Sequence, residues 1–126
     1  MVRVLADGSS KVLPFLVTRD ELVRDLKMLL AAGPPLRLAL LFGSVARGSD
    51  HTGSDLDVPI LPIDRELGLA DELALQTRLA LLAKREVDVV RLDPCTPELR
   101  FRVAREGVPL VGDRSVLNAF RARAGI

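Results

Sequence analysis

Residues 38–57 read LALLFGSVARGSDHTGSDLD, and this stretch decides the fold of the chain. Its first five residues are apolar, and with Arg37 they form a run that is too short for a helix and apolar enough for a strand buried on both faces. Gly43 and Ser44 then end the strand, and a polar, glycine-rich segment follows over 45–54. The closing Asp-Leu-Asp begins a second strand in which acidic and apolar residues alternate. The sequence therefore predicts two strands joined by a glycine-rich segment.

Periodic patterns on both sides of this stretch predict an alternation of helices and strands. In chain order we expect a helix capped by Thr18 and ended by Gly33, strands over 37–42 and 55–61, a helix over 67–85, a strand over 86–92, a helix from Thr96 to Gly107, a short strand over 109–111 and a helix that Ser115 opens. This order predicts an α/β (α+β) fold, in which a small mixed β-sheet is flanked by helices.

The length of 126 residues is typical of one domain, and we expect a single domain over 1–126. Its core spans about 18–112, and a C-terminal helix covers 113–126. The first 17 residues form either a short hairpin or an extended arm. One residue conflicts with the strand over 55–61, because Pro59 cannot donate to a β-ladder. We expect this strand to end near Val58, to bulge, or to lie at an edge from that point on.

Composition excludes several classes of protein. The 18 Lys and Arg residues nearly balance 17 Asp and Glu residues, and the chain has four Phe but no Tyr or Trp, so direct nucleic-acid binding is not expected. The only cysteine, Cys95, cannot form an internal disulfide, which favours a reducing, cytoplasmic setting. No apolar run approaches the roughly 18 residues of a membrane span, and we expect neither a span nor a signal peptide.

The segment after the first strand carries groups that suit a phosphate. Gly43 lets the backbone approach a ligand closely, because it has no Cβ and tolerates positive φ. Ser44 adds a hydroxyl donor, and Arg47 adds a planar guanidinium that matches phosphate oxygens. Taken alone, a Gly-Ser pair after a strand is usually no more than a turn.

Three acidic residues could hold a divalent cation. On an extended strand Asp55 and Asp57 project from the same face, with Cα atoms roughly 6.6 Å apart. Two carboxylates so close stay ionised readily when a hard cation such as Mg²⁺ lies between them. Asp88 could complete the site if its strand lies beside the second one, with Val87 and Val89 facing the core. A lone Asp-x-Asp is usually a solvated strand face, but the ordered set of strand, Gly-Ser, Asp-x-Asp and later Asp favours a functional site.

Other polar residues have plainer explanations. His51, the only histidine, could touch a phosphate or an acceptor, although a solvated loop position is the simpler interpretation. We assign Cys95 no role. The basic residues near the C-terminus could meet an acidic partner or RNA, but charged helix faces are usually only solvated; they are Arg100, Arg102, Arg105, Arg114, Arg121 and Arg123.

Gly43-Ser44, ten intervening residues and Asp55-Leu56-Asp57 resemble the signature of the polymerase-β-like nucleotidyltransferase superfamily. The form Gly-Ser-Val-Ala-Arg-Gly over 43–48 resembles its minimal nucleotidyltransferase (MNT) branch. The resemblance runs from about Leu38 to Val111, since 86–90 looks like the strand of the third carboxylate and 100–110 like the closing helix and strand. The first twenty residues are not covered.

The resemblance implies a nucleotidyltransferase fold that binds ATP as substrate and Mg²⁺, with two cations expected. By position, Gly43 and Ser44 would bind the β- and γ-phosphates, with Arg47 and Ser54 as further nucleotide-binding residues. Asp55 and Asp57 would ligate the metals. Asp88 would ligate one metal and activate the attacking hydroxyl, so that AMP is transferred and pyrophosphate leaves.

Members of this branch are commonly antitoxins paired with a HEPN-domain ribonuclease toxin, which they silence by attaching AMP to a tyrosine. The resemblance therefore implies a protein adenylyltransferase that forms a hetero-oligomer with such a toxin. Two alternatives stay open. One is a non-catalytic binding module that blocks its partner by occlusion. The other is a small-molecule nucleotidyltransferase of the aminoglycoside-modifying kind, which usually needs an additional helical domain.

Overall fold

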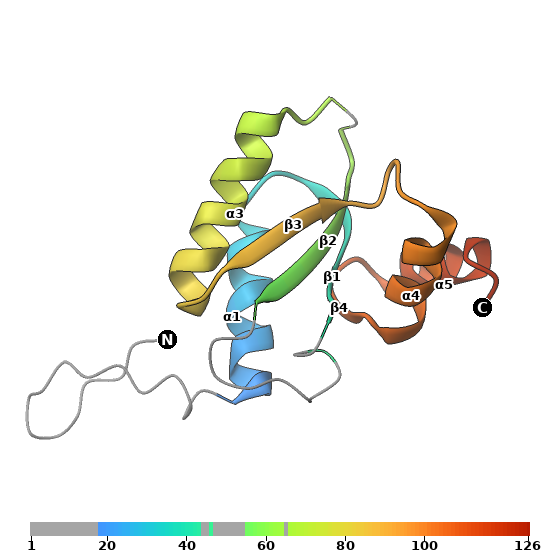
Figure 1. Cartoon of the computed structure of the whole chain (residues 1–126), viewed down its shortest axis with the longest axis horizontal. Helices are drawn as coiled ribbons and strands as arrows, with labels where there is room; N and C mark the ends of the chain where they lie inside the picture. Colours follow the sequence, from blue (N-terminus) through green and yellow to red (C-terminus); the bar gives the residue numbers. More distant parts are fainter. Residues whose placement is uncertain (1–17, 44–45, 47–54, 65) are drawn as a thin grey trace, which may run out of the picture.

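The structure is a computed structural model that describes residues 18–43, 46, 55–64 and 66–126 (Figure 1). The elements in chain order are α1 (Arg19–Ala31), β1 (Leu36–Leu41), β2 (Leu56–Pro62), α3 (Leu69–Ala83), β3 (Val87–Arg91), α4 (Pro97–Glu106), β4 (Val108–Val111) and α5 (Arg114–Arg123). The predicted arm or hairpin over the first 17 residues lies outside this description. No helix among the described residues combines the length and apolar composition that a membrane span requires.

The four strands form one sheet in the order β3-β2-β1-β4. Strand β1 runs antiparallel to both β2 and β4, whereas β2 and β3 are parallel and are joined by α3. The predicted mixed sheet flanked by helices is therefore confirmed. Because β2 and β3 are parallel, their first residues lie at the same end of the sheet, next to the end of β1.

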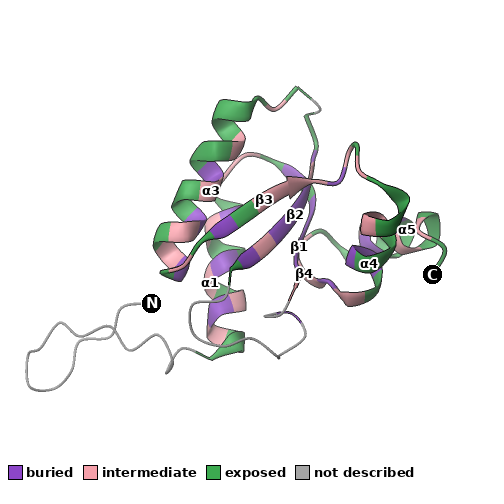
Figure 2. Cartoon of the chain, in the orientation of Figure 1, coloured by how far each residue is buried: buried purple, intermediate pink, exposed green. Residues whose placement is uncertain are grey.

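Helices cover both faces of the sheet (Figure 1). α1 and α3 pack on one face through the leucines Leu22, Leu26, Leu30, Leu75 and Leu79. α4 and α5 pack on the other face through Val103, Ala104, Leu117 and Phe120. The buried residues of Figure 2 therefore line the strands and the inward sides of the helices. The near-continuous apolar sequence of β1 follows from this two-sided burial.

Side-chain caps fix where several helices begin. The backbone N–H of Glu21 donates to the Thr18 hydroxyl at 3.0 Å, and that of Leu99 donates to the Thr96 hydroxyl at 3.2 Å, as predicted. The last helix begins at Arg114, within the expected range of 113–126, but Asp113 rather than Ser115 lies at its start as the cap, accepting from the N–H of Val116 at 2.9 Å.

The prediction for Pro59 was wrong. Strand β2 continues through it to Pro62, in the interior of the sheet, and Pro59 is fully buried. The pairing with β3 stays in register from Leu56 to Ile60, and bonds to β3 involve the even-numbered residues, such as the Leu56 N–H and the Ile60 carbonyl. The Pro59 nitrogen therefore faces β1, so its missing N–H removes one bond from that ladder while the β3 ladder stays whole.

Strand β3 lies at an edge of the sheet, and a side chain from α3 covers part of that edge. The carboxamide oxygen of Gln76 accepts from the backbone N–H of Val89 at 2.9 Å. Nearby, the guanidinium of Arg91 donates to the Leu67 carbonyl at 2.9 Å and lies 3.5 Å from the Glu72 carboxylate. These contacts hold α3 against the edge strand.

Candidate active site

Two of the predicted acidic residues, Asp57 and Asp88, lie at one end of the sheet, the lower end in Figure 1. Gly43 directly follows β1, Asp57 is the second residue of β2, and Asp88 is the second residue of β3. Asp57 and Asp88 are paired in the parallel register. The sequence predicts them on neighbouring strands, and the sheet confirms that placement.

Gly43 closely approaches the Asp57 carboxylate. Its φ is +98°, a backbone conformation that residues with a Cβ rarely adopt. A Cβ at this position would lie 2.8 Å from Oδ2 of Asp57. The preceding residue fixes the approach, because the backbone N–H of Phe42 donates to the Asp57 carbonyl at 2.9 Å. The turn after β1 therefore brings bare backbone next to a carboxylate, an approach that a side chain at position 43 would disturb.

The side chains of Asp57 and Asp88 project from the face of the sheet that packs against α4 and α5. Their neighbours Leu56, Val58 and Val87 are buried in the core on the opposite face. Because side chains alternate along a strand, the two aspartates point the other way. Asp88 is exposed and Asp57 is half-buried. A partner molecule can therefore reach Asp88 directly, while Asp57 lies deeper in the site.

Burial and nearby negative charges disfavour the ionised form of Asp57. Partial burial raises the pKa of this carboxyl above its usual range, and the negative charges of Asp88 and then Asp55 raise it further. Both predicted partners thus act on Asp57 from close by. A cation at this position would offset that repulsion, because it favours the ionised carboxylate.

The residues fit a hard divalent cation by chemistry. Carboxylate oxygens are the donors that Mg²⁺ prefers, and the repulsion on Asp57 is of the kind that a cation relieves. Within the described part of the chain, no group of three or more His, Cys, Asp or Glu side chains is already gathered to hold a metal. The three-carboxylate metal site therefore stays a prediction.

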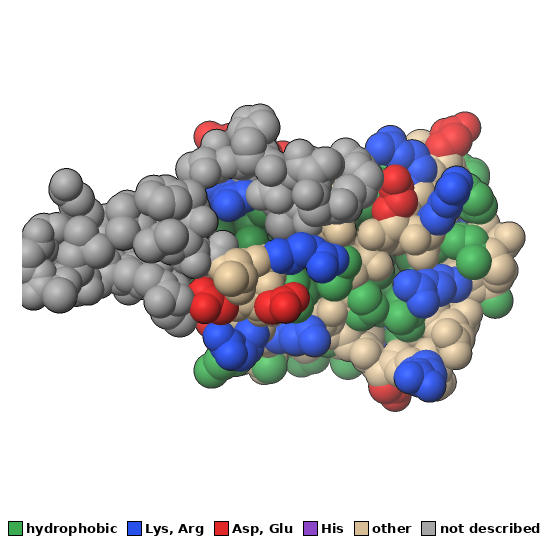
Figure 3. All heavy atoms as spheres, turned by 90° about the horizontal axis from the view of Figure 1, so that it is seen from below, with side chains coloured by type: hydrophobic (Ala, Val, Ile, Leu, Met, Phe, Trp, Pro, Cys, Tyr) green, Lys and Arg blue, Asp and Glu red, His purple; other side chains and the backbone are tan. Residues whose placement is uncertain are grey.

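Arg102 lies at the rim of the site, a position that the sequence does not predict. Its guanidinium carbon lies 5.4 Å from the ring centroid of Phe42, the residue before Gly43. Arg102 extends from α4, on the same face as the two aspartates. Figure 3 views this end of the molecule, and basic side chains lie beside acidic ones there. Sequence patterns are local, so they do not reveal this cation–π contact between residues 60 positions apart.

A second arginine contacts Ala46. The Arg19 guanidinium, at the start of α1, donates to the backbone carbonyl of Ala46 at 3.1 Å. Ala46 is buried against the core that α1 and α3 form. This contact joins Ala46 to the start of α1. The sequence does not predict this contact either, because a carbonyl acceptor has no signature in the sequence.

Four residues singled out from the sequence lie outside the described residues: Ser44, Arg47, His51 and Ser54. The nucleotide-binding roles expected of Ser44, Arg47 and Ser54 stay predictions. The sheet-end geometry of Gly43, Asp57 and Asp88 does not depend on them.

Comparison with known proteins gives consistent results. Residues 24–115 match the family described as polymerase beta, nucleotidyltransferase. A protein adenylyltransferase, MntA, from Shewanella oneidensis is 34% identical over 79 residues, which are 63% of this chain and 56% of that protein. The chain thus spans little more than half the length of this curated relative.

Two solved structures show the same arrangement of the chain. A toxin–antitoxin complex with AMP-PNP contains a chain with a TM-score of 0.73 and 29% identity, covering 81% of this chain and 82% of that one. A complex of a tri-AMPylated Shewanella oneidensis HEPN toxin with an MNT antitoxin gives a TM-score of 0.69 and 25% identity, covering 85% and 83%.

Proposed function

This chain belongs to the polymerase beta nucleotidyltransferase family, and we propose that it transfers AMP from ATP to a hydroxyl group of a partner protein. The partner is a HEPN-domain toxin, the acceptor is a tyrosine, and the modification makes this chain an antitoxin. One observation carries the proposal: Asp57 and Asp88 pair in register beside the positive-φ turn at Gly43. The proposal places the reaction in the cytoplasm, where ATP is available.

The relatives support the choice of acceptor. The curated relative is a protein adenylyltransferase, and one similar structure holds an AMPylated HEPN toxin together with an MNT antitoxin. Another similar structure holds the ATP analogue AMP-PNP. A protein acceptor is favoured over a small molecule, because the curated relative and the AMPylated toxin both indicate modification of a protein.

Four residues of this chain have distinct roles in the proposed reaction. Backbone at Gly43 would bind the triphosphate, and Asp55 and Asp57 would hold Mg²⁺, with two ions expected. When bound, these ions neutralise charge on the phosphates and on the attacking and leaving oxygens. Asp88, which is exposed, accepts the proton of the incoming hydroxyl. A bond forms between that oxygen and the α-phosphorus, the bond to the β-phosphate oxygen breaks, and pyrophosphate leaves.

Arg102 completes the site in this proposal. Its guanidinium is held over the Phe42 ring at the rim, next to the turn that would bind the phosphates. A guanidinium there binds the oxygens of the β- and γ-phosphates and stabilises the charge that develops on leaving pyrophosphate. Because the ring holds it from one side, its donors stay available to the nucleotide.

The direct test is transfer of label to the partner. The purified protein and its HEPN partner are incubated with Mg²⁺ and ATP labelled at the α-phosphate, and protein-bound label is measured. Wild type is expected to label the partner. Asp55→Asn removes a metal ligand and Asp88→Asn removes the proton acceptor, so each is expected to lower the initial rate at least about a hundredfold.

Complex formation is measured alongside transfer, because it distinguishes the remaining alternative. If wild type binds and silences the partner without labelling it, for all four nucleotides, the chain acts by occlusion and the transfer proposal is wrong. If label appears on a partner tyrosine and a phenylalanine substitution there abolishes it, the acceptor is identified.

A further inference from the structure

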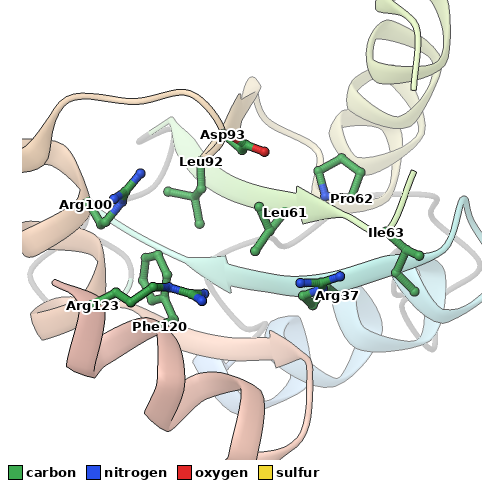
Figure 4. Close-up of a pocket in the computed structure, with 9 residues that line it drawn as sticks. All are labelled: Arg37, Leu61, Pro62, Ile63, Leu92, Asp93, Arg100, Phe120 and Arg123. Carbon is green, nitrogen blue, oxygen red and sulfur yellow. The ribbon is translucent and has the colours of Figure 1, made fainter. Parts of the chain in front are cut away.

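A second concave site lies at the other end of the sheet (Figure 4). It is a cavity of about 280 Å³ between the ends of the strands and helices α4 and α5. Its wall includes the start of β1, the end of β2 and the residues after β3. Asp57 and Pro62 are five residues apart on β2, so the two sites are separated by roughly 16 Å at about 3.3 Å per residue.

Three arginines from three different elements line this cavity. Arg37 comes from β1, Arg100 from α4 and Arg123 from α5. Figure 4 shows the Arg123 side chain extending toward Arg37, with Arg100 entering from α4 on the far side of Phe120. Within the described part of the chain, none of the three guanidinium groups forms an ion pair or side-chain hydrogen bond.

A β-bulge aims Arg37 at the cavity. In the pairing of β1 with β2, Leu36 is opposite Pro62 and Leu38 is opposite Leu61. Two steps along β1 therefore match one step along β2, and Arg37 is the extra residue. The bulge also reverses the alternation, because Leu36 packs in the core beside α1 and α3 while Leu38 packs beside α4 and α5. Bulges redirect side chains in this way.

The helices that carry the other two arginines are fixed to one another. The Nε–H of Arg121 donates to the carbonyl of Ala104 at 3.1 Å, which joins α5 to α4. Phe120 and Leu92, both buried, form an apolar floor beneath the arginines. The positive charges are thus held on a rigid frame.

The charge at this cavity is unbalanced. Among the described residues that line it, Asp93 is the only acidic one, and Asp93 has an interaction of its own. The described lining therefore holds three guanidinium groups and one carboxylate, which gives it two net positive charges. Like charges brought together on an apolar floor cost free energy unless an anion joins them.

We infer that this cavity binds an anion with two or more phosphate groups. Guanidinium groups match phosphate oxygens in pairs, and several arginines can share the oxygens of one oligophosphate chain. A single carboxylate offers only two oxygens, which is too few to accept from all three guanidinium groups. The cavity is also small and concave, which suits a compact anion better than a folded surface. The inference does not depend on the proposed transfer reaction, since no residue is shared.

Binding is tested in EDTA, so that metal-dependent binding at the other end of the sheet is absent. Inorganic pyrophosphate and ADP are titrated into the ¹⁵N-labelled full chain, and the arginine Nε–H signals are followed by NMR. We expect saturable shifts of the signals of Arg37, Arg100 and Arg123. Similar affinities for the two probes indicate recognition of the phosphates alone, whereas tighter binding of ADP shows that the nucleoside contacts the apolar floor.

Charge-removing variants locate the site. Arg37→Gln and Arg123→Gln change exposed residues and are expected to weaken binding of both probes at least about tenfold each. Arg78→Gln removes the same charge from α3, on the opposite face, and should change affinity less than about twofold. Melting temperatures verify that each variant is folded.

Three outcomes would overturn the inference. They are no saturable binding of either probe at millimolar concentration, affinities that Arg37→Gln and Arg123→Gln leave unchanged, and displacement of both probes by a glutamate-rich peptide at comparable concentration. The last outcome would assign the cavity to an acidic protein segment instead.

Discussion

The space that a side chain on residue 43 would need is taken by the carboxylate of Asp57. A Cβ there would lie 2.8 Å from Oδ2, and the φ of +98° adds backbone strain for any other residue. We therefore expect Gly43→Ala to abolish measurable AMP transfer, because either the turn or the carboxylate must move. The strain alone lowers the free energy of unfolding by roughly 1 to 2 kcal/mol, which thermal denaturation measures.

Gly125→Ala is the matched control for this variant. Gly125 has a φ of +91°, but a methyl group added to it would meet no atom within 4 Å, so only the backbone strain is shared. We expect a similar or smaller loss of stability near the chain end with full transfer activity. Equal activity losses in both variants would contradict the role given to the contact with Asp57.

Asp57→Asn should stabilise the protein in the absence of metal and nucleotide. The pKa of Asp57 is raised by burial and by the charges of Asp88 and Asp55, so the folded state binds this proton more tightly than the unfolded state does. Its contribution to stability is fully present below the usual carboxyl pKa and is lost as pH rises through the raised pKa. Melting curves in EDTA should therefore favour the Asn variant at pH 7, with the difference shrinking in acid.

The same variant should no longer respond to Mg²⁺. Addition of Mg²⁺ with a non-hydrolysable ATP analogue is expected to raise the melting temperature of wild type but not of Asp57→Asn.

Asp71→Asn is the control for the stability gain in EDTA, because it removes a favourable charge from the first turn of α3 and should lower stability slightly. A stability gain of the same size in Asp71→Asn would show that Asp57→Asn stabilises the protein only by changing its net charge.

Arg102→Gln should reduce kcat/KM for transfer by about tenfold to a hundredfold if the guanidinium stabilises the departing pyrophosphate. Arg102→Lys keeps the charge without the planar fork and should recover part of the loss. Arg105→Gln, in the last turn of the same helix, removes an equal charge and should leave kcat/KM within about twofold. Full activity of Arg102→Gln would restrict this residue to its contact with Phe42.

Arg19→Met tests the contact between α1 and the residues after the turn. Loss of the 3.1 Å hydrogen bond to the Ala46 carbonyl is expected to cost about 1 kcal/mol and to raise KM for ATP several-fold. Arg24→Met, an exposed arginine on the same helix, should alter neither. An unchanged KM in Arg19→Met would mean that the hydrogen bond to Ala46 is not needed for ATP binding.

Local chemistry made much of the fold predictable. Thr18 and Thr96 cap their helices because a hydroxyl can satisfy the first free N–H groups, and that rule operates within four residues. Asp57 and Asp88 became neighbours because parallel strands joined by a helix usually lie side by side. Both predictions needed only nearby sequence or a general rule of connection.

What could not be predicted depended on contacts between distant residues. Whether the strand continues through Pro59 depends on which neighbouring strand its nitrogen faces, and only the strand order determines that. Arg102 reaches Phe42, and Arg19 reaches Ala46, through packing of elements far apart in the sequence. The bulge at Arg37 is likewise visible only from the offset of its pairing partners.

The hydrogen bond from the Val89 N–H to Gln76 has a consequence for how the protein behaves at high concentration. An outer strand with open donors is a template on which another chain can extend the sheet, and this is a common route to fibrils. Here a side chain of the protein's own α3 already occupies that donor. Replacing Gln76 with leucine would uncover this donor, so Gln76 contributes to protecting the β3 edge against self-assembly.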